Sequence, residues 1–495
     1  MAKPLSILFV SSEVVPFAKT GGLADVSAAL PQVVREMGHD IRIIMPKFAA
    51  VSDRKFKIHD IKRLTDIPVD LDDRTFLASV KSSFLSNIKT KVQVYFISND
   101  TLYCRSDLYV DPKTKEAWPD NDDRFIFFCR GVIQTLILLG WKPDIIHLND
   151  WQSGLIAALL KTEFADEPLF KNTKVVFTVH NAAYQGIFPA ESFPKTGLPA
   201  KTFKPDGVEF FGQMNLLKAG LMYADMITTV SPTYAKEIRS GEDFGYGLEG
   251  VFKKKARKTV GILNGMDTHV WNPEVDTMIP QKYSAATLDD KAVNKKALCE
   301  RFGLHYDPTV PVIGIVSRLA DQKGFDLIQE VLPDLMQLPL QLVVLGSGEK
   351  RYEEMFTKGA KKFKKKLAAH IGFDEELAHL IEAGSDMFLM PSKYEPCGLN
   401  QMYSLRYGTL PIVRATGGLA DTVEDLLAKP KGGTGFVFER YNAKDMLKTI
   451  KAAVEMYAQQ DAWKAAMKRA MAKDNSWDAS ASKYIELYKQ LLKKK

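Results

Sequence analysis

The sequence has little cysteine and no long apolar run. Its 495 residues include four cysteines, scattered without any Cys-x-x-Cys pair: Cys104, Cys129, Cys299 and Cys397. This scatter argues against a disulfide framework or a zinc ribbon and is typical of a reducing compartment. No stretch of about 20 apolar residues is present, which argues against a membrane span. The apolar run at the N-terminus is too short for a signal peptide, so we expect a cytoplasmic protein.

Several catalytic signatures are also missing. The sequence has no Walker A loop, no nucleophile elbow with a Ser-His-Asp order and no metal-ligand cluster, so we expect neither a metal nor a cofactor. The net charge of +7 is a mild excess of 67 basic over 60 acidic residues. Two basic runs, 252–258 and 358–367, show no nucleic-acid motif. We interpret them as solvated surface, with an anionic partner as the alternative.

Short apolar, β-branched runs alternate with helical patterns along both halves of the chain. The first half contains "LSILFV", "DIRIIMP", "KVQVYFIS", "DIIHLND", "KVVFTVH" and "MITTVS"; the second contains "PVIGIVSR", "LQLVVLG", "AAHIGF", "DMFLMPS", "TLPIVRA" and "GTGFVFE". Continuous apolarity is typical of parallel strands that are buried on both faces. The pattern therefore predicts an α/β protein with two Rossmann-like, doubly wound domains.

The domain boundaries follow from a polar stretch and from the C-terminus. We expect an N-terminal domain over 1–262 and a C-terminal domain over 263–474, joined by a hinge rich in turn residues and charge. Residues 475–495 carry apolar side chains at helical spacing. We expect this last helix to bridge the domains by packing back on the N-terminal one.

The string "TGGLAD" occurs twice, at 20–25 and at 416–421. Each copy follows an apolar strand pattern and opens a helical one. Paired glycines let a backbone come close to a ligand, and the start of a helix offers free N–H groups to an anion. The repeat predicts two anion-binding helix ends that face one another across a cleft and hold a phosphate-bearing substrate from both sides.

Other polar residues follow strands in the same way. Arg318 and Lys323 come after the first strand of the second domain, where two cations suit a diphosphate leaving group or form surface ion pairs. Glu395 precedes a helix, where a carboxylate often merely caps it. His180 and Asp150 end strands of the first domain and belong to the ligand edge of that sheet.

These residues lie within strings that resemble the bacterial-type glycogen and starch synthases. The strings are collinear over nearly the whole chain: "KTGGLADV", "HNAAYQGIFP", "TVSPTYAKEI", "DFGYGLEGVF", "NGMDTHVWNP", "SRLADQKGFD", "PSKYEPCGLNQMYSLRYGTLPIVRATGGLADTV" and "GTGFVF". The resemblance implies a retaining glycosyltransferase of the two-Rossmann GT-B architecture. It implies glucose transfer from a nucleoside-diphosphate glucose, usually ADP-glucose, to the nonreducing 4-hydroxyl of an α-1,4-glucan such as glycogen or starch.

The resemblance also implies roles for individual residues. It implies a catalytic set of Glu395, His180, Asp150, Arg318 and Lys323. It implies substrate contacts at Lys19, Gly22, Asn181, Asn264, Phe373, Cys397, Gly398, Leu399, Thr416, Gly417 and Gly418. No carboxylate is obviously poised as a nucleophile, so we favour front-face attack over a covalent intermediate.

Three positions depart from the pattern of this family or of its fold group. Asn149 replaces a second histidine of a His-x-His-Asp-Trp string. Tyr403 stands eight positions after Glu395, where the broader fold group often has another glutamate and the synthases usually do not. Phe373 replaces a tyrosine that would stack on adenine, which keeps the stacking but removes a hydroxyl.

Three alternative functions differ in what they require. A glucan phosphorylase shares the architecture but needs a lysine site for pyridoxal phosphate, and the "EPCGL" and "TGGL" strings belong to synthases. A non-catalytic glucan-binding paralogue would have lost Lys19, Arg318, Lys323 or Glu395, and all four are present. A synthase that prefers UDP-glucose differs only in its donor and remains open.

Overall fold

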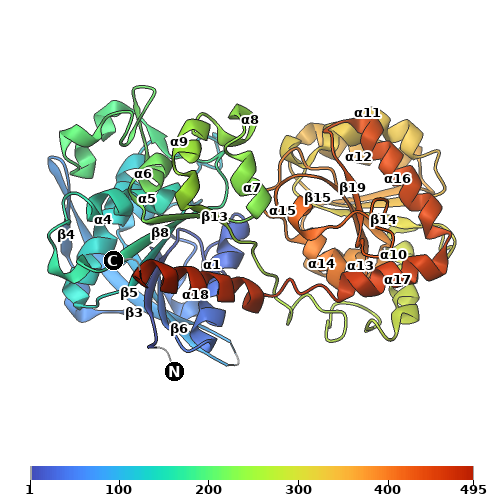
Figure 1. The fold of residues 1–495 in the computed structure, drawn as a ribbon, viewed down its shortest axis with the longest axis horizontal. Coiled ribbons are helices and arrows are strands. Elements are labelled where there is room, and N and C mark those ends of the chain that lie inside the picture. The colour runs from blue at the N-terminus through green and yellow to red at the C-terminus, as the bar shows by residue number, and fades with distance from the viewer. Residues whose placement is uncertain (1–2, 88, 494–495) are drawn as a thin grey trace. The chain divides into compact units, whose positions relative to one another are not determined.

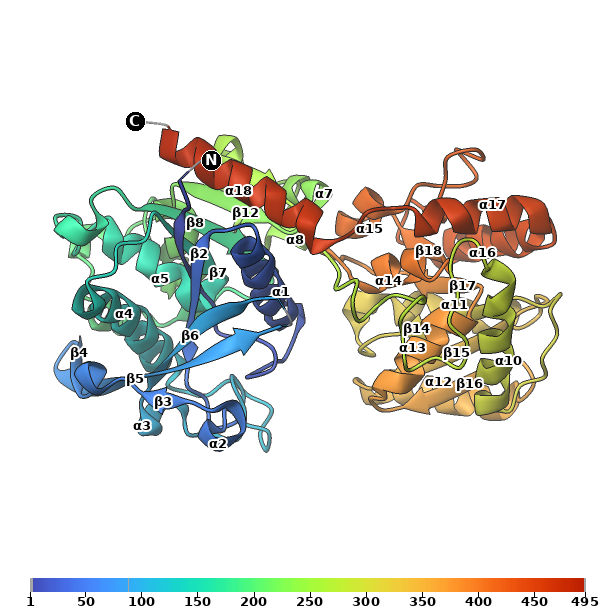
Figure 2. The ribbon, with the colours of Figure 1, turned by 90° about the horizontal axis from the view of Figure 1, so that it is seen from below.

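The computed structural model describes residues 3–87 and 89–493, which form two compact units (Figures 1 and 2). Unit 1 comprises the described residues of Met1–Val230, Ala235–Ile262 and Trp477–Lys495. Unit 2 comprises Ser231–Tyr234 and Leu263–Ser476. The division falls within helix α7 (Pro232–Glu237).

Unit 1 is built on a ten-stranded sheet of order β13-β12-β8-β7-β1-β2-β6-β5-β3, with β4 paired to β5. The strands from β13 to β6 in this order run parallel. Their bounds are β1 (Ser6–Val10), β2 (Asp40–Pro46), β6 (Lys91–Ser98), β7 (Ile145–Asn149), β8 (Lys174–Val179), β12 (Met226–Thr229) and β13 (Thr259–Gly261). A separate three-stranded sheet pairs β9 (Ile187–Phe188), β10 (Glu209–Phe210) and β11 (Gln213–Asn215).

The helices of unit 1 lie on both faces of its large sheet (Figures 1 and 2). They are α1 (Gly22–Glu36), α2 (Asp53–Phe56), α3 (Asp100–Tyr103), α4 (Asn121–Leu139), α5 (Trp151–Leu160), α6 (Leu216–Tyr223), α8 (Glu242–Gly245), α9 (Glu249–Lys254) and α18 (Trp477–Lys493). The central strand β1 is buried from Ile7 to Val10, as its unbroken apolar run predicts.

The antiparallel edge of this sheet was not predicted. Strand β5 (Arg74–Ser86) pairs antiparallel with β6, β3 (His59–Asp60) and β4 (Ile67–Leu71). Buried and exposed positions alternate along β4, which shows that one face of this strand is solvated. Such an alternating, partly polar strand gives a weaker sequence signal than a continuous apolar run.

Unit 2 contains a six-stranded, wholly parallel sheet of order β16-β15-β14-β17-β18-β19. Its strands are β14 (Val312–Val316), β15 (Gln341–Gly346), β16 (Leu367–Ile371), β17 (Met387–Met390), β18 (Leu410–Arg414) and β19 (Phe436–Phe438). Its helices are α10 (Lys291–Phe302), α11 (Phe325–Leu335), α12 (Lys350–Lys362), α13 (Glu375–Gly384), α14 (Asn400–Arg406), α15 (Gly417–Thr422), α16 (Ala443–Tyr457) and α17 (Gln460–Met471).

Both faces of the unit 2 sheet are covered by apolar clusters. Ile313 and Ile315 of β14 pack into one cluster, and Val312 of the same strand packs into the other. A strand that is buried on both faces is the arrangement its apolar run predicts. The predicted fold class, two Rossmann-like α/β domains, is therefore confirmed.

The C-terminal helix α18 packs on α1 within unit 1. A buried stripe of Tyr484, Leu487, Tyr488 and Leu491 faces the unit. The Tyr488 hydroxyl lies 2.6 Å from Nδ1 of His147, and Nε2 of His147 lies 2.6 Å from Oγ1 of Thr178. Both ring nitrogens are thus satisfied, and burial lowers the pKa of His147 to about 3.

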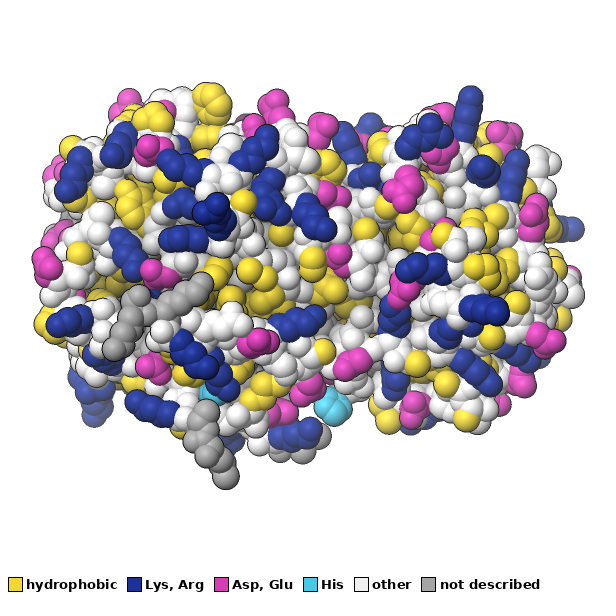
Figure 3. Space-filling view, in the orientation of Figure 1, with side chains coloured by type: hydrophobic (Ala, Val, Ile, Leu, Met, Phe, Trp, Pro, Cys, Tyr) yellow, Lys and Arg dark blue, Asp and Glu magenta, His cyan; other side chains and the backbone are white. Residues whose placement is uncertain are grey.

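Most lysine and arginine side chains of the two basic runs are exposed. In the first run Lys253, Lys254, Arg257 and Lys258 are exposed, and Lys358, Lys361, Lys362, Lys364 and Lys365 are exposed in the second. Figure 3 shows one face of the molecule, on which lysine and arginine side chains are interspersed with acidic and uncharged ones. None of the helices within residues 3–87 and 89–493 combines the length and apolarity that a membrane crossing requires.

The buried contact between α18 and His147 generates a stability prediction. The substitution Tyr488→Phe leaves one nitrogen of a buried imidazole without its partner, which should lower the free energy of unfolding by about 2 kcal/mol. Urea denaturation of the full chain measures this loss. The exposed position Lys483 on the same helix supplies the control, because Lys483→Ala should change stability by less than about 0.5 kcal/mol. Equal stability of Tyr488→Phe and wild type would contradict the assignment.

Candidate active site

The predicted residues of unit 1 lie where three neighbouring parallel strands end. Strands β1, β7 and β8 are adjacent in the sheet, so their carboxyl ends share one edge. Asp150 directly follows β7, His180 and Asn181 follow β8, and the segment that leads to Gly22 follows β1. Open α/β sheets bind their ligands at this edge.

Asp150 is held in an unusual backbone conformation. Its φ is +55° and its ψ is −177°, a region that residues with a side chain rarely occupy. Its carboxylate accepts hydrogen bonds from the main-chain N–H of His180, at 2.7 Å, and of Asn181. Burial raises the pKa of Asp150 to about 7, and the nearby charge of Glu13 adds to this rise.

His180 is oriented by the asparagine that departs from the family pattern. Nε2 of His180 lies 2.9 Å from Oδ1 of Asn149, and Nδ2 of Asn149 donates to the carbonyl of Val10 at 2.9 Å. The second bond fixes which end of the amide faces the histidine, so Nε2 carries the proton. Burial lowers the pKa of His180 to about 3, and the imidazole is therefore neutral at physiological pH.

The first glycine pair leaves open space above its backbone. A Cβ atom added at Gly21 or Gly22 would meet nothing within 4 Å, so a ligand has room to approach. Lys19 is half-exposed and pairs with Asp25 of the same motif at 2.7 Å.

Glu13 is a functional candidate that the sequence reasoning missed. Its buried carboxylate accepts hydrogen bonds from the N–H and hydroxyl of Thr20, from the N–H of Gly21 and from the hydroxyl of Tyr109. The pattern of apolar residues around Glu13 does not predict these hydrogen bonds. The feature of the sequence that could have indicated Glu13 is an acidic residue between a buried strand and a glycine-rich helix start.

In unit 2, Glu395 is paired with Lys323. Oε2 of Glu395 lies 2.5 Å from Nζ of Lys323 and 3.1 Å from the hydroxyl of Ser392. Glu395 is 6% exposed, so this carboxylate is buried and compensated by a cation. The helix-cap interpretation of Glu395 is not needed, because its side chain bonds to other groups.

Arg318 and Lys323 lie on the segment between β14 and α11. Arg318 is exposed, and its guanidinium has no acceptor within residues 3–87 and 89–493. Gly324 has a φ of +75°, and a Cβ there would lie 2.0 Å from the carbonyl oxygen of Pro391. Only glycine fits this position, which brings Lys323 against the loop that carries Glu395.

The second glycine pair differs from the first because its space is filled. A Cβ at Gly417 would lie 1.9 Å from the carbonyl oxygen of Glu395, and one at Gly418 would lie 2.0 Å from that of Cys397. The N–H of Gly418 is 3.2 Å from the carbonyl oxygens of Glu395 and Pro396. The Glu395 loop therefore packs directly against these two glycines. Helix α15, which follows Thr416, is only six residues long.

The remaining predicted contacts surround this loop or lie apart from it. Asn264 is buried, and its Oδ1 has no hydrogen-bond partner among the described residues. Cys397 is buried, and burial raises the pKa of its thiol to about 12, which excludes a reactive thiolate. Gly398 and Leu399 lead into α14. Phe373 is 88% exposed and follows β16, two strands from β14.

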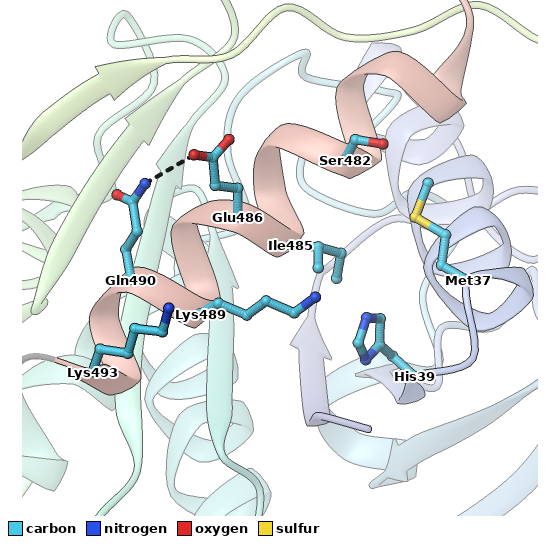
Figure 4. Close-up of a pocket in the computed structure, with 8 residues that line it drawn as sticks. All are labelled: Met37, His39, Ser482, Ile485, Glu486, Lys489, Gln490 and Lys493. Atoms are coloured by element: carbon cyan, nitrogen blue, oxygen red, sulfur yellow. Dashed lines mark hydrogen bonds between the residues drawn. The ribbon is translucent and has the colours of Figure 1, made fainter. Parts of the chain in front are cut away.

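A hollow in unit 1 contains none of the predicted site residues (Figure 4). It has a volume of about 540 Å³ and lies beside α18, where Ile485 and Lys489 face Met37 and His39. Nδ1 of His39 accepts the N–H of Leu5 at 3.0 Å, and burial and the nearby Lys489 lower the pKa of His39. The imidazole is thus a neutral structural group.

Comparisons with known proteins cover nearly the whole chain. A family described as "Starch synthase catalytic domain" matches residues 6–254, and one described as "Glycosyl transferases group 1" matches residues 300–470. Glycogen synthase 1 of Methylococcus capsulatus is 46% identical, with 99% of this chain and 97% of the relative aligned. Glycogen synthase 2 of Geobacter sulfurreducens is 44% identical, with 98% of each chain aligned.

Solved structures share the same architecture. The catalytic domain of starch synthase IV from Arabidopsis thaliana, bound to ADP and acarbose, matches with a TM-score of 0.87 and 31% identity. This match covers 99% of this chain and 100% of the plant domain. A sucrose-phosphate synthase from Thermosynechococcus elongatus matches with a TM-score of 0.58 and 16% identity, which shows the fold alone.

The raised pKa of Asp150 generates a pH-dependent prediction. The folded state binds a proton on Asp150 more tightly than the unfolded chain, whose aspartate pKa is near 3.8. This group therefore lowers stability as pH rises from about 4 through about 7. We expect Asp150→Asn to remove that component.

The measurement compares urea unfolding of the variant and the wild type at pH 5 and pH 8. The stability of Asp150→Asn relative to wild type should be higher at pH 8 than at pH 5 by about 2 kcal/mol. A stability difference that is the same at both pH values would contradict the buried, proton-binding carboxyl.

Proposed function

Because the chain belongs to the glycogen and starch synthases, a family of glycosyltransferases, we propose that it transfers glucose from ADP-glucose to the nonreducing 4-hydroxyl of an α-1,4-glucan with retention. The observation that carries the proposal is the ion pair between Lys323 and the buried carboxylate of Glu395. The plant relative, whose structure contains ADP and acarbose, supports this choice of donor and acceptor.

Arg318 and Lys323 suit the diphosphate of the donor. The guanidinium of Arg318 is exposed and without an acceptor among the described residues, so it is available for a bidentate contact with phosphate. Lys323 adds a cation that Glu395 holds in place. Two cations near the diphosphate stabilise the negative charge that develops as this group leaves. In unit 1, Lys19 and the N–H of Gly22 likewise suit an anion.

Glu395, Asn264 and His180 suit the glucosyl group. The buried Oδ1 of Asn264 has no partner within the described chain, and a sugar hydroxyl would satisfy it. Glu395 already accepts from Lys323 and Ser392, and its free lone pairs are positioned to accept a hydroxyl proton of the sugar. His180 is neutral, so it offers a hydrogen bond at the reacting carbon without adding a positive charge.

The transfer follows as front-face attack. The bond between the anomeric carbon and the diphosphate oxygen breaks, and the 4-hydroxyl oxygen of the glucan bonds to that carbon from the same face. The hydroxyl proton passes to the departing diphosphate oxygen. Glu395 is paired with a lysine, and Asp150 accepts two main-chain N–H groups, which favours front-face attack over a covalent intermediate on either carboxylate.

The donor and the acceptor are tested together by nucleotide release. We expect glycogen-dependent release of ADP from ADP-glucose, with much slower release of UDP from UDP-glucose under the same conditions. The variant Glu395→Ala removes the partner of Lys323 and a contact to the sugar, and should lower the rate at least a hundredfold. Preferential UDP release would keep the enzyme class and overturn the donor. Absence of glycogen-dependent release from either donor would favour a glucan-binding paralogue.

The exposed ring of Phe373 generates a prediction about the nucleotide. Stacking of an aromatic ring on a base contributes about 1–3 kcal/mol, so Phe373→Ala should raise the KM for ADP-glucose about tenfold. The kcat should change less, because the base is remote from the bond that breaks. Phe84, a half-exposed aromatic residue of unit 1, supplies the matched control. An unchanged KM for ADP-glucose in Phe373→Ala would remove Phe373 from the donor site.

A further inference from the structure

We propose that Glu13 is a positioning residue for donor binding, whose carboxylate fixes the 19–22 loop in the shape that receives the nucleotide sugar. This inference rests on the proposed function and adds a residue to it. Glu13 lies between the end of β1 and the start of α1, and its side chain is almost completely removed from solvent, with 4% exposed.

The carboxylate of Glu13 is engaged at both of its oxygens. Oε1 accepts the hydroxyl of Thr20 at 2.7 Å and that of Tyr109 at 2.9 Å. Oε2 accepts the N–H of Gly21 at 3.1 Å and the N–H of Thr20. The hydroxyl of Tyr109 lies in turn 2.8 Å from that of Ser12. An oxygen is required at Oε2, because both of its partners are N–H groups, and the negative charge of a carboxylate makes it a stronger acceptor than an amide oxygen.

These contacts decide which N–H groups face a ligand. The N–H groups of Thr20 and Gly21 are used by Glu13, whereas those of Gly22 and Leu23 have no acceptor within residues 3–87 and 89–493. The space above Gly21 and Gly22 is open. Glu13 therefore holds the N–H groups of Thr20 and Gly21 and leaves those of Gly22 and Leu23 for a ligand. This second pair lies at the N-terminus of a 15-residue helix, which is the positive end of its dipole.

In the second copy of the motif, the glycine that matches Gly22 has a different environment. There, the N–H of Gly418 bonds to main-chain oxygens of Glu395 and Pro396, which are neutral acceptors. Unit 1 instead buries a carboxylate close to a second acid, Asp150, although burying like charges near each other is unfavourable. This costly arrangement, beside a helix start with open space for a ligand, indicates a role of Glu13 in the site.

Glu13 also acts on Asp150 through its charge. Burial is the main cause of the raised pKa of Asp150, and the negative charge of Glu13 raises it further. The groups that face Asp150 are the N–H of His180 and Asn181, the carboxylate of Glu13 and the hydroxyl of Tyr109. Removing the charge of Glu13 should therefore lower the pKa of Asp150 as well as loosen the loop.

The experiment uses the full chain with Glu13→Gln, which keeps the size of the side chain and removes its charge. The KM for ADP-glucose at saturating glycogen and the Kd for ADP by calorimetry should both rise about tenfold, with a smaller change in kcat. The pH profile of kcat/KM should shift towards lower pH. In Glu13→Asp the charge remains but the reach is shorter, so the pH profile should stay close to wild type while the KM rises.

Two further variants separate positioning from folding. Asp122 is another buried carboxylate of unit 1, which accepts from Ser192 and pairs with Lys195, so Asp122→Asn controls for the loss of such a group. It should lower stability and leave the KM for ADP-glucose unchanged. Thr20→Val removes the hydroxyl contact to Glu13 alone and should raise that KM two- to threefold, even if Glu13→Gln fails to fold.

The outcomes are distinct. A destabilised Glu13→Gln with a wild-type KM for ADP-glucose and a wild-type Kd for ADP would overturn the inference and leave Glu13 a structural residue. If the wild type binds ADP but transfers no glucose, the proposed function fails, and the Kd for ADP of Glu13→Gln still decides the role of Glu13. A wild type that binds no ADP would overturn both.

Discussion

The carboxylate of Asp150 accepts two main-chain hydrogen bonds, from His180 and Asn181, and the positions of these two predicted site residues depend on this contact. This contact joins the ends of β7 and β8 just beyond Asn149 and Thr178, the last paired residues of the two strands. Asp150 reaches these N–H groups only because its backbone takes a positive φ, which is unfavourable for a residue with a Cβ. In return, the backbone of His180 is fixed, and Asn149 on the same strand end can orient the imidazole.

Most of the fold could be predicted because parallel strands buried on both faces give unbroken apolar runs, as in β1 and β14. The same signal placed Asp150 and His180 at strand ends. The antiparallel β5 was missed because alternating side chains resemble a polar loop in a single sequence. Glu13 was missed for a different reason, since its role depends on four donors from Thr20, Gly21 and Tyr109 that only the folded chain brings together.

The two copies of the repeated motif have the same sequence but different surroundings. Both copies follow a strand and open a helix, as expected, but their environments differ. Gly22 faces open space, whereas the backbone of the Glu395 loop lies against Gly418. The acid of the motif differs likewise: Asp25 pairs with Lys19, and Asp421 accepts from Thr233. The same six residues thus form one turn with open space above its glycines and another turn that packs against the Glu395 loop.

Tyr403 stands where the broader fold group often has a second glutamate, and its packing accounts for the aromatic residue at this position. Its ring stacks on Trp271 with centroids 4.1 Å apart, and Trp271 stacks on its other side on the buried His379. Trp271 belongs to the segment that enters unit 2, so Tyr403 anchors this segment to α14. A glutamate at 403 would place an unpaired charge in this stack, which is unfavourable. Position 403 is therefore used for packing, which leaves Glu395, paired with Lys323, as the carboxylate that we propose for the chemistry of unit 2.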